Sequence, residues 1–332
     1  MVERKNDHIQ LAFQSQMELK DKDPRFYYEP ILNPHPPAEF KPFTFLGKEY
    51  KVPLWISSMT GGAHAARAIN SNLARVCKEF GFGMGLGSCR IILKPNNYFK
   101  DFDIRDIIGD SLPLYANLGI SQIEEAILNN QVEPIKELVK RLRADGLIIH
   151  VNPIQEWFQP EGDKLEKPPV ETITRLLEKV DFKVIVKEVG QGMGPASLRL
   201  LLKLPLAAIE FAAYGGTNFA KVELMRSDSV SRQLFEPFAA IGEDAYSMTD
   251  YINRIVEEES DKILCKEIII SGGIRHFLDG YYLIRKSKLP AIYGQASAFL
   301  KYANSSYEEL RKYIQLQIKG LQFAYAFLNI RE

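Results

Sequence analysis

The stretch Leu147-Ile-Ile-His-Val-Asn-Pro-Ile-Gln-Glu156 decides how this chain can fold. Its apolar beginning gives way to polar side chains, which are His150, Asn152, Gln155 and Glu156. Pro153 stands among them and cannot continue a strand. A buried strand that places polar side chains at its carboxyl end is how a parallel α/β protein builds a site. An ordinary polar loop after a strand explains the stretch equally well when it is taken alone.

Composition and charge narrow the class of protein. The chain has 332 residues, 46% of them apolar and 25% charged, which is typical of a globular protein with a large core. Lys plus Arg and Asp plus Glu both number 42, so no net charge favours nucleic acid or an anionic membrane as a partner. Cys77, Cys89 and Cys265 form no metal or disulfide pattern, which indicates a reducing compartment. With no signal-like apolar core at the N-terminus and no run long enough to span a bilayer, we expect a cytoplasmic protein.

Strands alternate with helices along most of the chain. We expect strands over 54–57, 82–86, 112–116, 146–150, 184–187, 207–211, 268–271 and 291–293. We expect helices over 63–79, 97–108, 134–143, 170–179, 195–202, 245–258, 276–286 and 307–328. Eight strand–helix units predict an α/β protein with a single (β/α)8 TIM barrel rather than two doubly wound domains. The barrel would occupy residues 54–332, and residues 1–53 would form an extension without sustained periodicity up to 37, followed by a short hairpin over 43–52.

Polar or glycine-rich residues follow every expected strand, at the end where barrels hold their active sites. Besides the stretch at 150–156, they are Met59, Thr60, Gly61, Gly62, Gly87, Ser88, Cys89, Arg90, Asn117, Lys187, Glu188, Tyr214, Gly215, Gly216, Thr217, Ser271, Gly272, Gly273, Ile274, Arg275, Gly294, Gln295 and Ala296. Their shared position at one end of all eight strands is hard to explain as loop filler.

The glycine turns after the seventh and eighth strands favour a phosphate site. Barrels commonly bind phosphate there with backbone N–H groups and a helix N-terminus, although Gly272-Gly273 alone could simply turn the chain. Arg275 or Thr217 could add donors. Lys187 ends an apolar strand and needs an anion or a polarised carbonyl opposite it, unless it reaches out to solvent. With Thr60, Ser88 and Asn117, these contacts are typical of a flavin ring and its phosphate tail.

A second group of residues favours a diphosphate. Arg4, Lys5 and His8 crowd the N-terminus, where basic residues are usually just solvated, and could clamp a diphosphate together with Arg90 and His150. Glu156 is a hard oxygen ligand suited to Mg²⁺, which takes one carboxylate plus substrate phosphates and waters. No pattern for zinc, for a Ser-His-Asp triad or for single-stranded nucleic acid is present in the sequence.

These residues resemble the type 2, FMN-dependent isopentenyl diphosphate isomerases along nearly the whole chain. The matching stretches are Arg4-Lys5-Asn6-Asp7-His8, Met59-Thr60-Gly61-Gly62, Asn117-Leu118-Gly119, the stretch from His150 to Glu156, Lys187-Glu188-Val189-Gly190, Gly215-Gly216-Thr217 and Ser271-Gly272-Gly273-Ile274-Arg275. Their order and spacing together are specific, whereas Gly-Gly-Thr or Ser-Gly-Gly alone would fit other flavin barrels. The chain departs from the family pattern at Cys89, where a Gln is usual, and over 276–293.

The resemblance implies an isomerase of isoprenoid biosynthesis that interconverts isopentenyl and dimethylallyl diphosphate on reduced FMN. NADPH would supply the reducing equivalents, Mg²⁺ would be required, and the protein would be a homo-oligomer, a tetramer or an octamer. Reduced flavin would act as acid and base without net redox change, and a neutral Gln155 beside the cation-like state would be safer than a carboxylate.

The resemblance also implies roles for single residues. FMN would be held by Met59, Thr60, Gly61, Ser88, Asn117, Lys187, Thr217, Gly272, Gly273, Arg275, Gly294, Gln295 and Ala296. The diphosphate substrate would be held by Arg4, Lys5, His8, Ser88, Arg90, His150, Asn152 and Gln155. Catalysis would fall to Gln155, His150 and Lys187, and the metal to Glu156.

Two other functions fit the same barrel. An FMN-dependent oxidase or dehydrogenase of a small hydroxy acid needs a His base over the flavin, and His276 after Arg275 could be read that way. The set Asn152, Gln155 and Glu156 favours the isomerase instead. A flavin-binding relative without catalytic activity is the third possibility.

Overall fold

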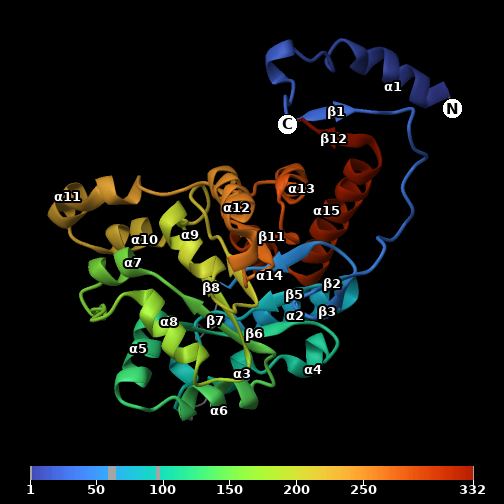
Figure 1. Cartoon of the computed structure of the whole chain (residues 1–332). Helices are drawn as coiled ribbons and strands as arrows, with labels where there is room; N and C mark the ends of the chain where they lie inside the picture. The colour runs from blue at the N-terminus through green and yellow to red at the C-terminus, as the bar shows by residue number, and fades with distance from the viewer. Residues whose placement is uncertain (1, 59–64, 95–97, 332) are drawn as a thin grey trace.

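Eight parallel strands close into one barrel (Figure 1). The computed structural model describes residues 2–58, 65–94 and 98–331. The strands follow one another around the barrel in chain order, and the last one pairs with the first. Their bounds are β4 Leu54–Ile56, β5 Gly83–Gly85, β6 Leu114–Gly119, β7 Gly146–His150, β8 Lys183–Lys187, β9 Ala208–Glu210, β10 Ile268–Ser271 and β11 Ala291–Gln295. The (β/α)8 barrel expected from the sequence is confirmed.

The barrel strands are apolar because both of their faces are covered. The three aliphatic side chains at 147–149 in β7 are fully buried, as are the three isoleucines of β10. β7 and β8 pair in register along their whole length, so that His150 at the end of β7 is the partner of Lys187 at the end of β8. The polar residues that end neighbouring strands therefore lie together at one rim of the barrel.

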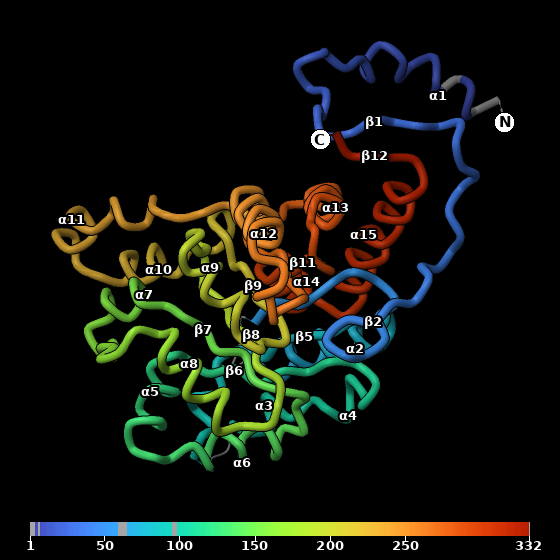
Figure 2. Tube along the Cα trace, in the orientation of Figure 1, coloured from blue at the N-terminus to red at the C-terminus, as the bar shows by residue number. Residues whose placement is uncertain are grey.

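Helices pack around the outside of the barrel (Figure 2). In α2 the buried residues Ile69, Leu73 and Val76 recur at helical spacing, and the helix ends at Gly81, whose φ of 74° suits a residue without a side chain. None of the described helices is long and apolar enough to cross a membrane. The helices are α2 Ala66–Phe80, α3 Phe99–Phe102, α4 Arg105–Ile108, α5 Ile120–Leu128, α6 Glu133–Arg141, α7 Pro153–Phe158, α8 Pro169–Leu177, α9 Pro195–Leu202, α10 Phe219–Arg226, α11 Ser229–Ala239, α12 Ala245–Glu259, α13 Phe277–Lys286, α14 Ser297–Ser305 and α15 Tyr307–Phe327.

Several helices differ from the sequence-based expectation. The helix expected over 97–108 is two short ones, α3 and α4. The segment from Pro153 was expected to be a loop but forms α7, because proline is well tolerated in the first turn of a helix. Helices α5 and α14 were not expected. α5 begins directly after β6, and only Ala296 separates α14 from β11, so the loop that usually marks a boundary is missing or very short. The long excursion after β9 contains α10 and α11.

The N-terminal segment has more structure than its sequence suggested. Residues 1–37 were expected to lack regular structure, but they include α1 Val2–Ala12, a 3-10 turn at Leu19–Asp21 and β1 Phe26–Tyr28. β1 pairs antiparallel with β12 Leu328–Ile330, which ties the two ends of the chain together (Figure 1). The expectation was wrong because the pairing depends on residues about 300 positions apart, which no local pattern reveals.

The expected hairpin covers the amino ends of the barrel strands. β2 Phe43–Phe45 and β3 Lys48–Tyr50 pair antiparallel through a turn at Leu46 and Gly47. The Leu46 carbonyl accepts a hydrogen bond from Lys183 Nζ at 2.6 Å, and its N–H donates to Glu267 Oε2 at 2.7 Å. Leu46 is buried by these contacts. This end of the barrel is therefore closed, and the opposite rim is the one available for a site.

The division of the chain into an N-terminal extension, residues 1–53, and a barrel domain, residues 54–332, stays a prediction.

Candidate functional site

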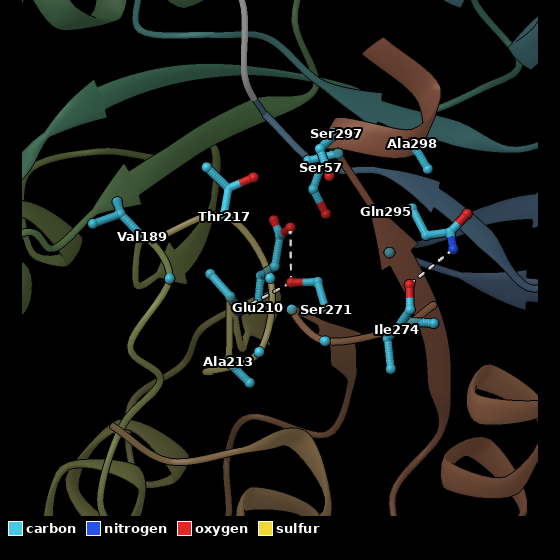
Figure 3. Close-up of a pocket in the computed structure, with 18 of the residues that line it drawn as sticks. Ser57, Val189, Glu210, Ala213, Thr217, Ser271, Ile274, Gln295, Ser297 and Ala298 are labelled. Atoms are coloured by element: carbon cyan, nitrogen blue, oxygen red, sulfur yellow. Dashed lines mark hydrogen bonds between the residues drawn. The ribbon is translucent and has the colours of Figure 1, made fainter. Parts of the chain in front are cut away.

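A cavity of about 510 Å³ lies at the carboxyl ends of the barrel strands (Figure 3). It is bounded by the ends of β8 to β11 and of β4 and by the loops that follow them. Eight residues expected to bind a cofactor line it, namely Lys187, Thr217, Gly272, Gly273, Arg275, Gly294, Gln295 and Ala296. The structure thus brings together residues from four separate parts of the sequence, although their roles stay predictions.

Two glycine turns meet on one side of this cavity. Gly215, Gly272 and Gly273 have φ values of 106°, 85° and 72°, which residues with side chains rarely adopt. A Cβ on Gly272 would lie 2.2 Å from the backbone nitrogen of Ala213, and one on Gly216 would lie 3.1 Å from that of Gly273. Only glycine allows the two turns to approach this closely. The turns form a wall of main-chain atoms that a phosphate group can approach.

The start of α14 completes this part of the cavity. Ser297 and Ala298 in its first turn line the cavity, and Ser297 points into it (Figure 3). The N–H groups of a first helical turn lack intrahelical acceptors and favour an anion. Arg275 and Lys301 add two cationic side chains to the lining. Main-chain N–H groups, a helix start and two cations are the donor set that binds a phosphate monoester.

Gln295 holds the glycine turn in place rather than standing free in the cavity. Its Nε2 donates to the carbonyl oxygen of Ile274 at 3.0 Å (Figure 3). Its Oε1 accepts from Tyr313 Oη at 3.1 Å and from Gln317 Nε2 at 3.0 Å. The amide expected to contact a cofactor is therefore already bonded at both ends, so it fixes the segment that follows Gly273.

The floor of the cavity carries a buried lysine and a buried carboxylate. Lys187 Nζ donates to the carbonyl oxygen of Glu188 at 2.6 Å. Burial lowers the pKa of Lys187, and the nearby carboxylates of Glu210 and Glu188 raise it. Glu210 was not predicted to be a site residue, although a carboxylate within the apolar run 207–211 was a signal that could have identified it.

Two hydroxyls at the end of β4 also line the cavity. Those of Ser57 and Ser58 are buried without a partner among the described residues, which is typical of polar groups that bind a ligand.

His150 is neutral and held in one orientation. Burial, and then the charge of Lys187, lower its pKa to about 3, so the imidazole carries no charge at neutral pH. Its Nδ1 lies 2.8 Å from Asn117 Oδ1, an acceptor, and therefore donates, which leaves Nε2 with the lone pair. Asn117 Nδ2 donates to the carbonyl oxygen of Leu86 at 3.1 Å. Asn117 therefore orients His150, and one N–H of its amide remains for a ligand, so its expected contact with a cofactor stays a prediction.

The stretch 152–156 forms a polar cluster on α7 beside α10. Asn152 Nδ2 donates to Gln155 Oε1 at 3.0 Å and to Glu156 Oε1 at 2.9 Å. Gln155 Nε2 donates to Glu223 Oε1 at 3.1 Å. Glu223 is buried on α10. The sequence did not reveal it, because it lies in the long segment between β9 and α12 and does not follow directly after an expected strand. The Gln155 amide is oriented by a neighbour on each side.

Glu156 is the carboxylate that was expected to bind a metal. Its Oε2 accepts from the backbone N–H of Asp163 at 3.0 Å. Asn152, whose Nδ2 bonds to Glu156, has its Oδ1 buried without a partner among the described residues. The described part of the chain contains no group of three or more His, Cys, Asp or Glu side chains that could hold a metal ion by itself. One carboxylate and one amide oxygen fit Mg²⁺ only when a phosphate supplies further oxygens.

Other expected residues lie elsewhere. Arg4, Lys5 and His8 are exposed on α1, which lies away from the barrel (Figure 1). Arg90 is half-exposed and forms an ion pair of 3.2 Å with Asp163. Ser88 is exposed and does not line the cavity. Met59, Thr60 and Gly61 lie outside the described residues.

Comparison with known proteins gives the same architecture. Over 90% of this chain and 71% of the other, the fold is similar to the recombinant flavin-binding domain of baker's yeast flavocytochrome b2, with a TM-score of 0.59 and 13% identity. A mandelate oxidase mutant with a monooxide FMN adduct matches 92% of this chain and 88% of its own, with a TM-score of 0.56 and 12% identity. No family model matches the sequence. The fold and the position of the cavity define a TIM barrel with an enzyme-type site at the carboxyl ends of its strands.

Sequence relatives identify the family. The isopentenyl-diphosphate delta-isomerase of Rickettsia africae (strain ESF-5) is 34% identical over 326 residues, which are 97% of this chain and 92% of the relative. The protein of the same name from Rickettsia felis is 32% identical over 334 residues, with 97% and 91% covered. The chain belongs to the isopentenyl-diphosphate delta-isomerase family.

Proposed function

We propose that this protein is a type 2 isopentenyl diphosphate isomerase that uses FMN, and that it interconverts isopentenyl and dimethylallyl diphosphate. The single observation that carries the proposal is the cavity at the strand ends, which joins a glycine-lined phosphate cradle to a floor with a buried lysine and unpartnered hydroxyls. This arrangement, in a chain related over its full length to isomerases of that name, supports the reaction.

The donors around the cavity suit the groups of FMN. The turns at Gly215-Gly216 and Gly272-Gly273, with the start of α14, would hold the phosphate. Ser57 and Ser58 have hydroxyls free to bond to the remainder of the cofactor, and Lys187 would face its electron-rich ring. Reduced FMN would supply a group that gives up and takes back a proton without net redox change. We include NADPH as the reductant that prepares it.

The residues of α7 would position the substrate. Gln155 is uncharged and fixed by Asn152 and Glu223, so it can line the path of the reacting carbons without being alkylated by a cation-like state. Neutral His150 could accept a hydrogen bond at Nε2 or take up a proton as the diphosphate binds. Glu156 and the free Asn152 Oδ1 would bind Mg²⁺ together with diphosphate oxygens. Arg90 would exchange Asp163 for the diphosphate.

The basic residues on α1 remain part of the proposal. Arg4, Lys5 and His8 are exposed and away from the cavity, so binding to the diphosphate requires movement of the N-terminal segment or supply from another copy of a homo-oligomer. A tetramer or an octamer in the cytoplasm is the assembly that we propose.

An FMN-dependent oxidase of a small hydroxy acid is the second candidate, because the structural neighbours include a mandelate oxidase. That chemistry needs a His base over the flavin. His276 instead caps α13, where its Nε2 lies 3.6 Å from Asp279 Oδ1, and it does not line the cavity. The structure therefore favours the isomerase.

The absorbance spectrum of the purified protein, followed by parallel turnover assays, tests this proposal. A flavin spectrum and turnover of isopentenyl diphosphate, but not of lactate-like acids, would support it. Turnover of the hydroxy acids would favour the oxidase. A yellow protein inactive in reduced, Mg²⁺-containing buffer would indicate a relative without catalysis.

A further inference from the structure

The end of β9 places a fully buried carboxylate at the floor of the cavity. Glu210 has an exposed fraction of 0% yet borders the cavity, where it points toward the interior (Figure 3). Its hydrogen-bond donors are neutral: Trp55 Nε1 lies 3.3 Å from Oε2, and Ser271 Oγ lies 3.3 Å from Oε1. The neutral hydroxyl of Ser57 also acts on this carboxylate and lowers its pKa. A buried carboxylate with only neutral partners is costly unless a cation lies near it.

That cation is Lys187 on the neighbouring strand. Lys187 and Glu210 are register partners across the parallel pair of β8 and β9, so their side chains leave the same face of the sheet. Both line the cavity floor. Burial raises the pKa of Glu210, whereas the charge of Lys187 lowers it. Each ionised group thus favours the charged form of the other.

The other charged groups near Lys187 are already engaged. Glu188 on its own strand end accepts hydrogen bonds from the backbone N–H groups of Gly190 and Gln191, each at 2.6 Å. His150 on β7 is neutral and bonded to Asn117, so it supplies no charge that could stabilise the ionised form of Lys187. Both carboxylates raise the pKa of Lys187, Glu210 more than Glu188, and Glu210 is the one of the two that is the register partner of the lysine.

We propose that Glu210 is a positioning residue that keeps Lys187 charged and aimed into the cavity. Lys187 has three N–H donors and gives one to the Glu188 carbonyl, so donors remain for a ligand. The assignment rests on the proposed function, because the group that the lysine would face is the electron-rich ring of bound FMN. Glu210 itself need not touch the reacting atoms.

Charge and shape can be separated at this position. Glu210→Gln keeps the size and one oxygen acceptor but removes the charge, whereas Glu210→Asp keeps the charge on a shorter side chain. Glu267→Gln is a matched control, because Glu267 is a partly buried carboxylate at the opposite end of the barrel, where it accepts from the Leu46 N–H. All three variants are checked for native thermal unfolding before comparison.

Competitive acetylation with acetic anhydride measures the result at Lys187 in the whole chain. Only the neutral amine reacts, so the yield at Lys187, read by mass spectrometry across pH, gives its titration midpoint. We expect the midpoint to fall by about one pH unit or more in Glu210→Gln, and to stay near the wild-type value in Glu210→Asp and Glu267→Gln. An unchanged midpoint in Glu210→Gln, or an equal fall in Glu210→Asp, would overturn the proposal.

The same variants connect the lysine to activity. In Glu210→Gln the alkaline limb of kcat/KM for isopentenyl diphosphate should move to lower pH with the labelling midpoint, which a purely structural role would not produce. If the alkaline limb of kcat/KM stays in place while the labelling midpoint of Lys187 moves, the link between the lysine and activity is rejected. The labelling needs neither turnover nor bound flavin, so a protein without isomerase activity would reject the proposed function and leave the assignment of Glu210 standing on its own result.

Discussion

Replacing Gln295 with Leu should weaken the binding of FMN by loosening the turn that holds its phosphate. The substitution removes the hydrogen bond from Gln295 Nε2 to the Ile274 carbonyl and the two that its Oε1 accepts from Tyr313 and Gln317. Tyr313 Oη and Gln317 Nε2 still bond to each other at 2.6 Å, so they keep a partner. The carbonyl of Ile274, directly after Gly273, is the group left without one.

The expected loss of FMN affinity follows from the single unpaired carbonyl of Ile274. A partly buried acceptor without a partner costs about 1–3 kcal/mol. If the turn relaxes to recover this cost, the loss appears in FMN affinity as an increase in Kd of about 5- to 150-fold, since about 1.4 kcal/mol corresponds to a factor of ten. The free energy of unfolding should fall by a similar amount at most, so the barrel should remain folded.

Titration of the flavin-free protein with FMN, followed by quenching of flavin fluorescence, measures this Kd. Tyr313→Phe is the matched control, because it removes one donor to Gln295 and leaves the bond from Gln295 to Ile274 intact. We expect Tyr313→Phe to change the Kd less than threefold, within about 0.6 kcal/mol. Equal Kd values for wild type and Gln295→Leu would refute the idea that this amide supports the phosphate site.

Three further predictions concern the cofactor, the metal and the N-terminal segment. Gly273→Val should abolish the yellow colour of the purified protein and leave its circular dichroism nearly unchanged, because the left-handed turn next to the Tyr214 carbonyl has no room for a side chain. Glu156→Gln should lower the rate in a way that excess Mg²⁺ partly restores, whereas excess Mg²⁺ should not restore Gln155→Asn, since that loss comes from a shortened arm. Equal rescue of both would contradict the separate roles. Arg4→Ala should raise KM for the diphosphate and leave flavin content constant, as kinetics and absorbance would show.

Much of the barrel was predictable because its strands are buried on both faces. Continuous apolar runs identify such strands, and the expected bounds 146–150 and 268–271 are those of β7 and β10. The expected helix over 195–202 is α9, which begins at a proline. Segment 153–158 was expected to be a loop because its proline cannot continue a strand, although proline also starts helices.

The site was only partly predictable for a related reason. Glycine turns and polar strand ends mark the rim of a barrel in the sequence, so Gly272 and Lys187 could be expected there. Which side chains bond to each other depends on register and on side-chain direction. The pairing of Lys187 with Glu210 appears only once β8 and β9 are aligned, and the contact of Gln155 with Glu223 requires α10 to pack beside α7.

Incubation with isopentenyl diphosphate in ²H₂O tests the central claim most directly. The purified protein is supplied with FMN, NADPH and Mg²⁺ without oxygen, and the product is analysed by NMR while NADPH is followed by absorbance. The account predicts dimethylallyl diphosphate that carries deuterium, with far less than one NADPH consumed per product formed. Absence of that product, or consumption of one NADPH for each turnover, would contradict it.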